Sequence, residues 1–384
     1  MLTPLVLSLL SASASAQAVT KCSPPGKAPI GQPPVGQAGP GEAPDAKAAC
    51  QPRPGNVTLD KFQLYPENAG VDTERCLVYF SALYNSSVAV WNPLENKFLD
   101  SITIQNITGK ASQHASGVRR DAAHDTLSIM LNAGAAFDTS GSDISGENYL
   151  VSYDLKSKSV KYVKDLTTFT DGQFGGFQDF EHGDDGSTYV IGTYPGSLYK
   201  VSPDGNDVKA LWQTKNENGN FLNITGVGKV DDNTLIVPGK SDVSGIYRFD
   251  VKSESCEPVK VPLTATNGNA TLGADLDGAL LPASYNREIF LISDNTDGTY
   301  VIRSNDQWKS AEVLGVIPNP FLADGGSSVA TVEVGSTIYA VTEFFGDAAN
   351  PPVPGTLAGN RTEFPLNDIT EEVAKLTGKS AAQV

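Results

Sequence analysis

Short runs of β-branched and aromatic residues alternate with turn-forming residues along most of this chain. In the stretch 187–208, the apolar runs Thr188–Ile191 and Ser197–Val201 are separated by Tyr194-Pro195-Gly196 and followed by Pro203-Asp204-Gly205-Asn206. Pro, Gly, Asn and Asp favour turns, because they preset or tolerate unusual φ angles. The stretch therefore predicts a strand, a turn, a second strand and a second turn.

The same unit recurs along the chain, and its recurrence predicts the fold. The second strand of each unit is marked by the apolar anchors Val78, Leu127, Tyr189, Leu235, Ile289 and Ile338. These anchors stand roughly 46 to 62 residues apart, which is the period of a four-stranded propeller blade. Six units predict an all-β protein, a six-bladed β-propeller.

The expected blades fill most of the chain. They are predicted at residues 59–104, 113–166, 176–212, 223–263, 275–317 and from 327 toward 369. A C-terminal strand at 362–366 is expected to pair with the first strand near Val57, because such pairing closes the ring and removes both sheet edges. Residues 371–376 are expected to add a helical turn or more.

The start of the chain differs in composition from the predicted blades. The apolar run Leu5–Leu10 is followed by small residues with Ala-x-Ala spacing, and it is too short to cross a bilayer. We therefore expect a signal peptide at 1–18, a Pro/Gly-rich N-terminal strap at 19–54 and a single propeller at 55–384. The expected location is outside the cell or in the lumen of the secretory pathway, with no membrane attachment after signal cleavage.

Glycosylation motifs and cysteines agree with that compartment. The N-x-S/T acceptors, of which chance alone explains about half, are Asn56, Asn85, Asn106, Asn223, Asn269 and Asn360. The four cysteines are Cys22, Cys50, Cys76 and Cys256. None is spaced as C-x-x-C, so a zinc or dithiol redox site is not expected. Cys76 and Cys256 fall on opposite sides of the predicted ring, so we expect the pairs Cys50–Cys76 and Cys22–Cys256.

Charge and missing motifs exclude several classes of function. The net charge is −16 with a pI near 4.6, and nucleic acids and anionic membranes both require a basic face. The acidity can also serve only to keep a secreted protein soluble. The chain contains no H-E-x-x-H, no G-x-S-x-G and no complete phosphate loop, which argues against zinc proteases, α/β-hydrolases and nucleotide-binding proteins.

The propeller topology sorts polar residues onto two faces. If strands a to d of each blade run outward from the axis, the loops that enter strand a and those that join b to c share one face. Two of the b–c loops, 132–148 and 345–361, are long, and long loops on a rigid scaffold are usually binding loops or lids. His114 is sorted onto this face, whereas His124 and His182 fall on the opposite one.

The loop-rich face carries the candidate site residues. The expected catalytic residues are His114, Asp275, Asp324 and Lys240. The expected substrate-binding residues are Tyr84, Phe177, Asp179, Tyr194, Asn223, Asp294, Phe321, Phe344 and Phe345. A histidine suits proton transfer near neutral pH, and phenylalanines suit an apolar ligand. The plainer alternatives are a structural hydrogen bond for His114 and packing between blades for the aromatic side chains.

A metal site is a further alternative. Three or more convergent oxygen ligands could bind Ca²⁺, and the acidic candidates are Asp179, Asp275, Asp277, Asp294, Asp324 and Glu343. Aspartates at strand ends are also ordinary turn residues. We therefore expect no cofactor, with Ca²⁺ left open.

Three segments, 64–68, 76–85 and 114–119, carry a family resemblance. Here the chain resembles a family of secreted fungal propellers found in secondary-metabolite clusters, among them a trichothecene-cluster protein and the hetero-Diels–Alderases of tropolone–sesquiterpene pathways. The resemblance implies a cofactor-independent enzyme that joins a tropolone-derived o-quinone methide to a humulene-type alkene. It supplies no catalytic motif that can be transferred residue by residue.

Two other functions remain open from the sequence. Asn223 and Asp277-Gly278 weakly echo a Ca²⁺-dependent lactonase-like propeller hydrolase. A secreted protein that binds an apolar metabolite without catalysis would need the same pocket. In each case the expected partners are small molecules rather than nucleic acids.

Overall fold

The computed structural model describes five segments of the chain, residues 50–215, 221–240, 244–265, 270–348 and 356–379. The chain divides into two compact units, residues 1–43 and 44–384, and every described residue belongs to the second. The predicted signal peptide and most of the predicted strap lie outside the described residues. No helix among the described residues is long and apolar enough to cross a membrane.

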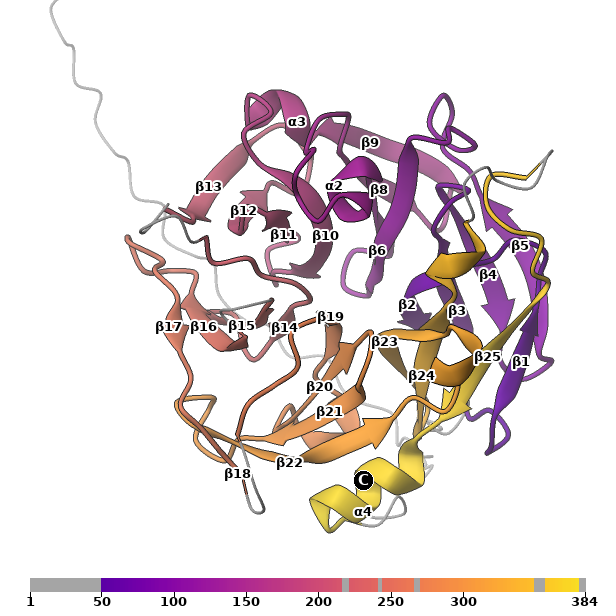
Figure 1. Cartoon of the computed structure of the whole chain (residues 1–384). Coiled ribbons are helices and arrows are strands. Elements are labelled where there is room, and N and C mark those ends of the chain that lie inside the picture. The colour runs from indigo at the N-terminus through magenta and orange to yellow at the C-terminus, as the bar shows by residue number, and fades with distance from the viewer. Residues whose placement is uncertain (1–49, 216–220, 241–243, 266–269, 349–355, 380–384) are drawn as a thin grey trace, which may run out of the picture. The chain divides into compact units, whose positions relative to one another are not determined.

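Six antiparallel blades surround a central axis, so the predicted six-bladed propeller is confirmed (Figure 1). In the first three blades the strands follow chain order from the axis outward. Blade 1 contains β2 (Pro66–Asp72), β3 (Leu77–Ala82), β4 (Ser87–Asn92) and β5 (Lys97–Ile102). Blade 2 contains β6 (Gln113–Asp121), β7 (Thr126–Ala133), β8 (Tyr149–Asp154) and β9 (Ser159–Asp165). Blade 3 contains β10 (Gly175–His182), β11 (Thr188–Tyr194), β12 (Ser197–Val201) and β13 (Val208–Gln213).

Blade 4 keeps this order, whereas blades 5 and 6 depart from it at their outer edges. Blade 4 contains β14 (Gly228–Lys229), β15 (Thr234–Gly239), β16 (Gly245–Asp250) and β17 (Val259–Lys260). Blade 5 contains β19 (Leu276–Leu280), β20 (Ile289–Asp294), β21 (Gly298–Arg303) and β22 (Ala311–Pro318), with β18 (Leu263–Ala265) added in parallel to β22. Blade 6 contains β23 (Ser327–Val334), β24 (Thr337–Glu343), β25 (Glu363–Asp368) and β1 (Val57–Asp60).

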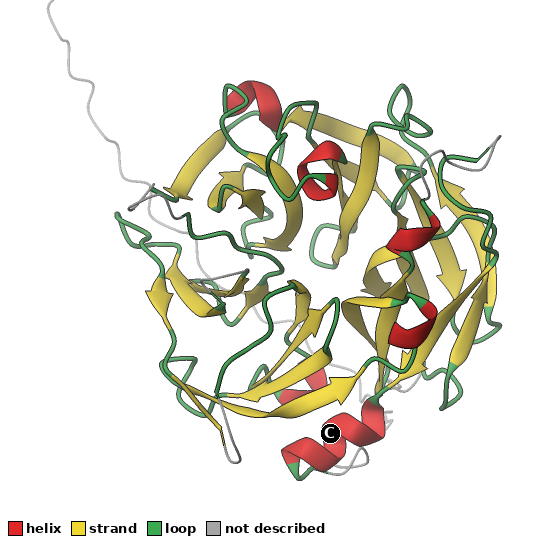
Figure 2. Ribbon diagram, viewed as in Figure 1, coloured by secondary structure: helices red, strands yellow, loops and turns green. Residues whose placement is uncertain are grey.

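Helices are short and few in the described part of the chain (Figure 2). The α-helices are α2 (Ala135–Asp138), α3 (Leu166–Phe169) and α4 (Thr370–Thr377). The 3-10 helices are η2 (Ala283–Tyr285), η3 (Leu322–Asp324) and η4 (Phe345–Asp347). The helix expected at residues 371–376 is therefore present as α4, which buries Val373 and Ala374.

The ring closes between the two ends of the described chain. The N-terminal β1 pairs with the C-terminal β25, with Val57 opposite Leu366 and Leu59 opposite Phe364. Both Leu59 and Phe364 are fully buried. The predicted closure is confirmed, and it leaves the last blade with four strands.

Glycines allow neighbouring inner strands to approach each other closely. A Cβ atom at Gly117 in β6 would lie 2.7 Å from the backbone oxygen of Gln178 in β10. A Cβ at Gly278 in β19 would lie 2.6 Å from the backbone oxygen of Val329 in β23. Both distances are too short for real side chains, so these positions require glycine to keep the blades tightly packed around the axis.

One disulfide ties the segment before β1 to blade 1. Cys50 bonds to Cys76, with the two Cα atoms 5.0 Å apart, and this predicted pair is confirmed. Gln51 extends the attachment, because its Oε1 accepts a hydrogen bond of 2.8 Å from the backbone N–H of Ser336 in blade 6. Cys256 is buried and has no disulfide partner among the described residues. Cys22 lies outside them, so the second predicted pair stays a prediction.

The six glycosylation acceptors differ in exposure. Asn56, Asn106 and Asn360 are exposed, whereas Asn85 and Asn223 are half-buried. Asn269 lies outside the described residues. Their modification stays a prediction.

Candidate functional site

Irregularities in the inner strands direct polar side chains toward the axis. The register with the second strand shifts between Pro66 and Ala69 in β2, and the same kind of shift occurs in β6, β10 and β19. A bulge of this kind re-aims the side chains of the extra residues. The residues at the four shifts that line the axial pocket are Glu67, Ser116, Gln178 and Asp277.

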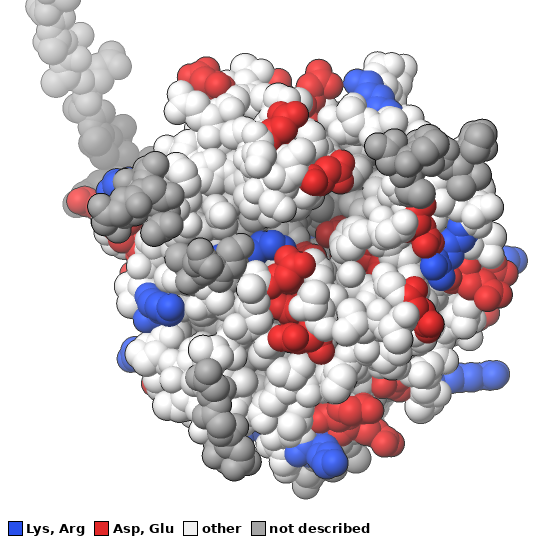
Figure 3. Space-filling view, in the orientation of Figure 1, with Lys and Arg blue, Asp and Glu red and all other residues white. Residues whose placement is uncertain are grey.

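The pocket opens at the centre of the face with the long loops, and Figure 3 shows a hollow there with acidic and basic side chains around it. Its volume is about 370 Å³, within the range of small-molecule sites. The apolar and aromatic lining consists of Leu83, Tyr84, Phe137, Tyr194, Phe345 and Ala348. The remaining polar lining consists of His114, Asn132, Asp138, Ser140, Lys240, Asp275 and Asn295.

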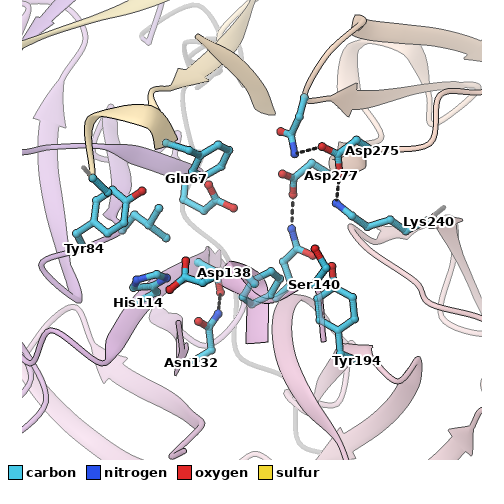
Figure 4. Close-up of a pocket in the computed structure, with 17 residues that line it drawn as sticks. Glu67, Tyr84, His114, Asn132, Asp138, Ser140, Tyr194, Lys240, Asp275 and Asp277 are labelled. Carbon is cyan, nitrogen blue, oxygen red and sulfur yellow. Dashed lines mark hydrogen bonds and ion pairs between the residues drawn. The ribbon is translucent and has the colours of Figure 1, made fainter. Parts of the chain in front are cut away.

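Lys240 supplies a fixed positive charge on one side of the pocket (Figure 4). Its Nζ lies 2.7 Å from Asp275 Oδ1 and donates a hydrogen bond of 3.1 Å to the backbone oxygen of Leu276. Burial opposes the charge, but the nearby carboxylates of Asp277 and Asp275 outweigh it and raise the pKa of Lys240. The ammonium has a third N–H with which to donate to a bound oxygen.

Asp277 is held on the axis by an oriented amide. Gln178 donates from Nε2 to Asp277 Oδ1, while its Oε1 accepts a hydrogen bond of 2.6 Å from Thr225. Burial raises the pKa of Asp277 to about 7, although Lys240 acts in the opposite direction. Both protonation states of this carboxyl are therefore populated near neutral pH.

Glu67 faces the same space from blade 1. Its side chain is buried, and Oε2 has no hydrogen-bond partner among the residues that the structure describes. Burial raises the pKa of Glu67 well above its ordinary value, and the neighbouring carboxyls of Asp277 and Glu343 add to the effect. Burial therefore favours the protonated, uncharged form of the Glu67 carboxyl.

His114 lines the opposite side of the pocket from Lys240 (Figure 4). Its ring meets Tyr84 edge-on at 5.2 Å between centroids, and a Cβ at Gly134 would lie 2.5 Å from its Cε1 atom. Burial lowers the pKa of His114, against the attraction of Asp138. The imidazole is therefore neutral near pH 7 and able to accept a proton.

The other two histidines lie at the far end of the inner strands, as the sorting of faces predicts. His124 follows β6 and its Nδ1 lies 2.7 Å from Asp121 Oδ2. His182 ends β10, and its Nε2 lies 2.9 Å from the hydroxyl of Ser128. Neither histidine lines the axial pocket.

The structure brings part of the predicted site together. Six of the predicted catalytic and substrate-binding residues line the pocket, namely His114, Lys240, Asp275, Tyr84, Tyr194 and Phe345. They come from loops that enter strand a or join b to c. The rule for sorting the faces therefore selects these six residues without any motif.

Four other candidates have structural contacts outside the pocket lining. Phe177 is fully buried against Tyr199 in blade 3, with ring centroids 5.8 Å apart. Asp179 is buried beside Arg119, at 3.5 Å from its NH2. Phe321 packs against the core between blades 6 and 1, and Phe344 is buried in that core. For the three phenylalanines, the alternative of packing between or within blades holds.

Polar candidates outside the lining serve turns or face solvent. Asp294 is buried and caps a turn, since its Oδ1 accepts from the backbone N–H groups of Thr296 and Asp297 at 2.9 Å each. Asp324 is exposed on η3. Asn223 is half-buried, and its backbone oxygen accepts a hydrogen bond of 2.8 Å from the N–H of Lys240.

Glu67 is the main residue that reasoning from the sequence misses. Asp277 is predicted from the sequence only as a possible Ca²⁺ ligand, and Gln178 is also missed. In the structure, Ser116, Gln178 and Asp277 are each the first residue within the register shift of strand a. Glu67 occupies the same place in β2.

The carboxyls do not form a recognisable metal centre. No group of three or more His, Cys, Asp or Glu side chains arranged to hold a metal ion occurs among the described residues. Asp275 is paired with Lys240, and Asp179 with Arg119. The acidic set proposed for Ca²⁺ is thus dispersed, because Asp294 caps a turn, Asp324 is exposed and Glu343 is buried outside the pocket lining, which leaves Asp277 beside the Asp275–Lys240 pair.

Comparisons with known proteins connect this architecture to a family. The chain is 31% identical over 344 residues to trichothecene biosynthesis protein 14 of Trichoderma arundinaceum, covering 85% of this chain and 91% of the relative. It is also 31% identical over 342 residues to core trichothecene cluster protein 14 of Fusarium sporotrichioides, covering 84% and 87%. The crystal structure of the Malassezia sympodialis allergen Mala s 1 superposes with a TM-score of 0.66 at 22% identity, covering 82% of this chain and 96% of the allergen.

A family model extends over most of the propeller. The model, described as Mal s 1 allergenic protein-like, matches residues 46–317. The match includes blades 1 to 5 and all the lining residues of the pocket except Phe345 and Ala348. This chain therefore belongs to the Mal s 1-like family and is related to fungal proteins of trichothecene clusters.

Proposed function

We propose that the protein is a cofactor-independent hetero-Diels–Alderase of fungal secondary metabolism. Its substrates would be a tropolone-derived o-quinone methide and a humulene-type alkene. The observation that carries this proposal is the axial pocket, where aromatic side chains share the lining with the ammonium of Lys240, the imidazole of His114 and the buried carboxyls of Glu67 and Asp277. Relatives named for trichothecene clusters support a role in the same kind of metabolism.

The pocket can contribute to cycloaddition chiefly by positioning. Holding two reactants in an attack geometry can lower a barrier by several kcal/mol, since the entropy of bringing them together is lost on binding rather than in the reaction. Tyr84, Phe137 and Phe345 offer apolar surface for the alkene. Lys240 can donate to the carbonyl oxygen of the diene, which makes the diene more electron-poor and more reactive toward an alkene.

Proton transfer would prepare the reactive diene. A hydroxymethyl tropolone becomes an o-quinone methide when it loses water, and this step requires removal of the ring hydroxyl proton. His114 is neutral and lines the pocket, so it can accept that proton. The imidazolium that forms is stabilised by the nearby carboxylate of Asp138.

Incubation of the purified protein with a hydroxymethyl tropolone and humulene tests the proposal. We expect the adduct to form faster and with higher stereoselectivity than in buffer, as measured by chiral liquid chromatography. Binding of both compounds without acceleration would instead identify a carrier of apolar metabolites. Dependence of the rate on added Ca²⁺, with hydrolysis of a lactone, would favour the lactonase-like alternative.

Histidine variants test the role of the pocket. His114→Ala is expected to lower the rate by about 100-fold or more, the usual size of a lost proton-transfer contribution. The matched controls His124→Ala and His182→Ala lie on the far face and are expected to stay within about threefold of the parent. Equal rates in all three variants would remove His114 from the mechanism.

A further inference from the structure

The carboxyls in the axial pocket differ in what stabilises them. Asp275 pairs with Lys240 at 2.7 Å and accepts from Asn295 Nδ2 at 3.3 Å, so its negative charge is compensated. Asp277 accepts a hydrogen bond from the amide of Gln178. Glu67 is only 9% exposed, and its Oε2 has no hydrogen-bond partner among the described residues.

The position of Glu67 follows from the register of β2. The strand pairs regularly with β3 from Ala69 to Asp72 and again at Pro66, and the shift between these points contains Glu67. Figure 4 shows its carboxyl pointing into the cavity, across from Asp277 and Lys240. A buried carboxyl without a compensating charge is most stable in the protonated form, which can donate to a ligand.

Loss of water from an alcohol needs such a proton donor. Hydroxide is a poor leaving group, so the hydroxyl oxygen must be protonated as its bond to carbon breaks. His114 cannot supply that proton at neutral pH, because burial lowers its pKa and leaves the imidazole uncharged. Lys240 is unsuited, because its carboxylate neighbours raise its pKa and hold its proton.

We propose that Glu67 is the general acid that expels water when the diene is formed, a proposal that rests on the proposed function. The Glu67 proton passes to the hydroxyl oxygen, and the carbon–oxygen bond breaks with its electron pair on the departing water. His114 accepts the ring hydroxyl proton, and the electrons of that O–H bond complete the conjugated carbonyl of the quinone methide. The imidazolium then returns a proton to the Glu67 carboxylate, and no oxidant or reductant is required.

A change of leaving group isolates this role. Glu67→Gln keeps the size of the side chain and removes the acidic proton. With the hydroxymethyl tropolone and humulene, we expect the variant to form adduct at least about 100-fold more slowly than the parent. In the corresponding acetate ester, the acetate group leaves as an anion and needs no protonation. With this ester we expect the rate of Glu67→Gln to stay within about threefold of the parent's rate.

Glu181 offers a matched control. It lies near the end of β10, burial raises its pKa as it does for Glu67, and it does not line the pocket. Glu181→Gln should therefore leave the rates with the alcohol and the ester both within about threefold of the parent. Equal losses with alcohol and ester in Glu67→Gln would overturn the proposal, because they would indicate a structural role.

The pH profile gives a second readout. The parent should lose activity on the alcohol as pH rises through the pKa of Glu67, whereas its activity on the ester should not show this loss. Retention of activity on the alcohol by Glu67→Gln would also refute the acid role, while leaving the cycloaddition intact. Failure of the parent to accelerate either reaction would overturn the proposed function and this inference with it.

Discussion

The buried side chain of Asp277 lowers the stability of the fold but gives the pocket a carboxyl that can titrate near neutral pH. It is 4% exposed, and it accepts a hydrogen bond from the amide of Gln178. Burial raises its pKa from 3.8 to about 7, so the folded protein holds a proton that the unfolded chain releases. Burial of this carboxyl therefore lowers the free energy of unfolding above the ordinary pKa of an aspartate. In return, the pocket contains a carboxyl that can exist in both protonation states.

This residue makes stability depend on pH. Between about pH 4 and pH 7, the folded state binds more protons at Asp277 than the unfolded state does, so its contribution to the free energy of unfolding falls as pH rises. Asp277→Asn cannot ionise, so its stability relative to the parent should increase across this range and level off above it. Thermal unfolding from pH 4 to pH 8 measures the difference. Asp324→Asn, at an exposed position, is the control, and parallel curves for parent and Asp277→Asn would contradict the prediction.

At the scale of elements, η4 depends on a clamp from the segment that precedes β25. Arg361 contacts both oxygens of Asp347, with Nε 2.6 Å from Oδ2, and its guanidinium lies 3.6 Å from the centre of the Phe344 ring. Tyr65 adds a hydrogen bond of 3.3 Å to Asp347. These contacts fix η4, which places Phe345 at the pocket.

Removing the clamp should weaken substrate binding more than it slows the reaction. Arg361→Met eliminates an ion pair and a cation–π contact, which together are worth about 1 to 2 kcal/mol, so we expect KM for humulene to rise about tenfold with kcat less affected. Steady-state kinetics separates the two constants. Arg303→Met removes a pair of similar exposure in blade 5, where NH2 lies 2.6 Å from Glu312, and should change neither constant. A selective loss of kcat in Arg361→Met would contradict this account.

For the propeller as a whole, closure depends on a strand that comes from the other end of the chain. The four residues of β1 complete blade 6, and their contacts with β25 join positions about 300 residues apart, such as Val57 and Leu366. Leu59 provides the apolar anchor, because it is fully buried in the cluster that also contains Phe364 and Val341. Blades 1 and 6 meet at this joint, and both contribute side chains to the pocket lining. The shape of the pocket therefore depends on the closure.

Weakening the anchor should destabilise the ring cooperatively. Leu59→Ala leaves a cavity at the joint, and we expect a loss of about 2 to 5 kcal/mol in the free energy of unfolding. Denaturant unfolding followed by tryptophan fluorescence measures it. Asp60→Ala changes an exposed neighbour in the same strand and should cost less than about 0.5 kcal/mol. Equal stabilities for the two variants would show that β1 does not hold the ring closed.

Local sequence alone determined the propeller of six blades, the strand that closes it and the face on which His114 lies. These features follow from alternating apolar strands, turn residues and a regular repeat. Each of these patterns is local, because one repeat spans no more than about 60 residues. The Cys50–Cys76 pair also followed, because the order of the blades separates Cys76 from Cys256 and leaves Cys76 to pair with a cysteine of the N-terminal segment.

Only the tertiary structure decided which side chains from that face meet in the pocket. A shift of one residue turns a side chain from the blade core to the axis, and the bulges in the inner strands make that shift at Glu67 and Asp277. The same shifts leave Phe177 in the core and Asp179 beside Arg119. The protonation of Glu67 likewise depends on neighbours from distant blades, because burial and the carboxyls of Asp277 and Glu343 raise its pKa.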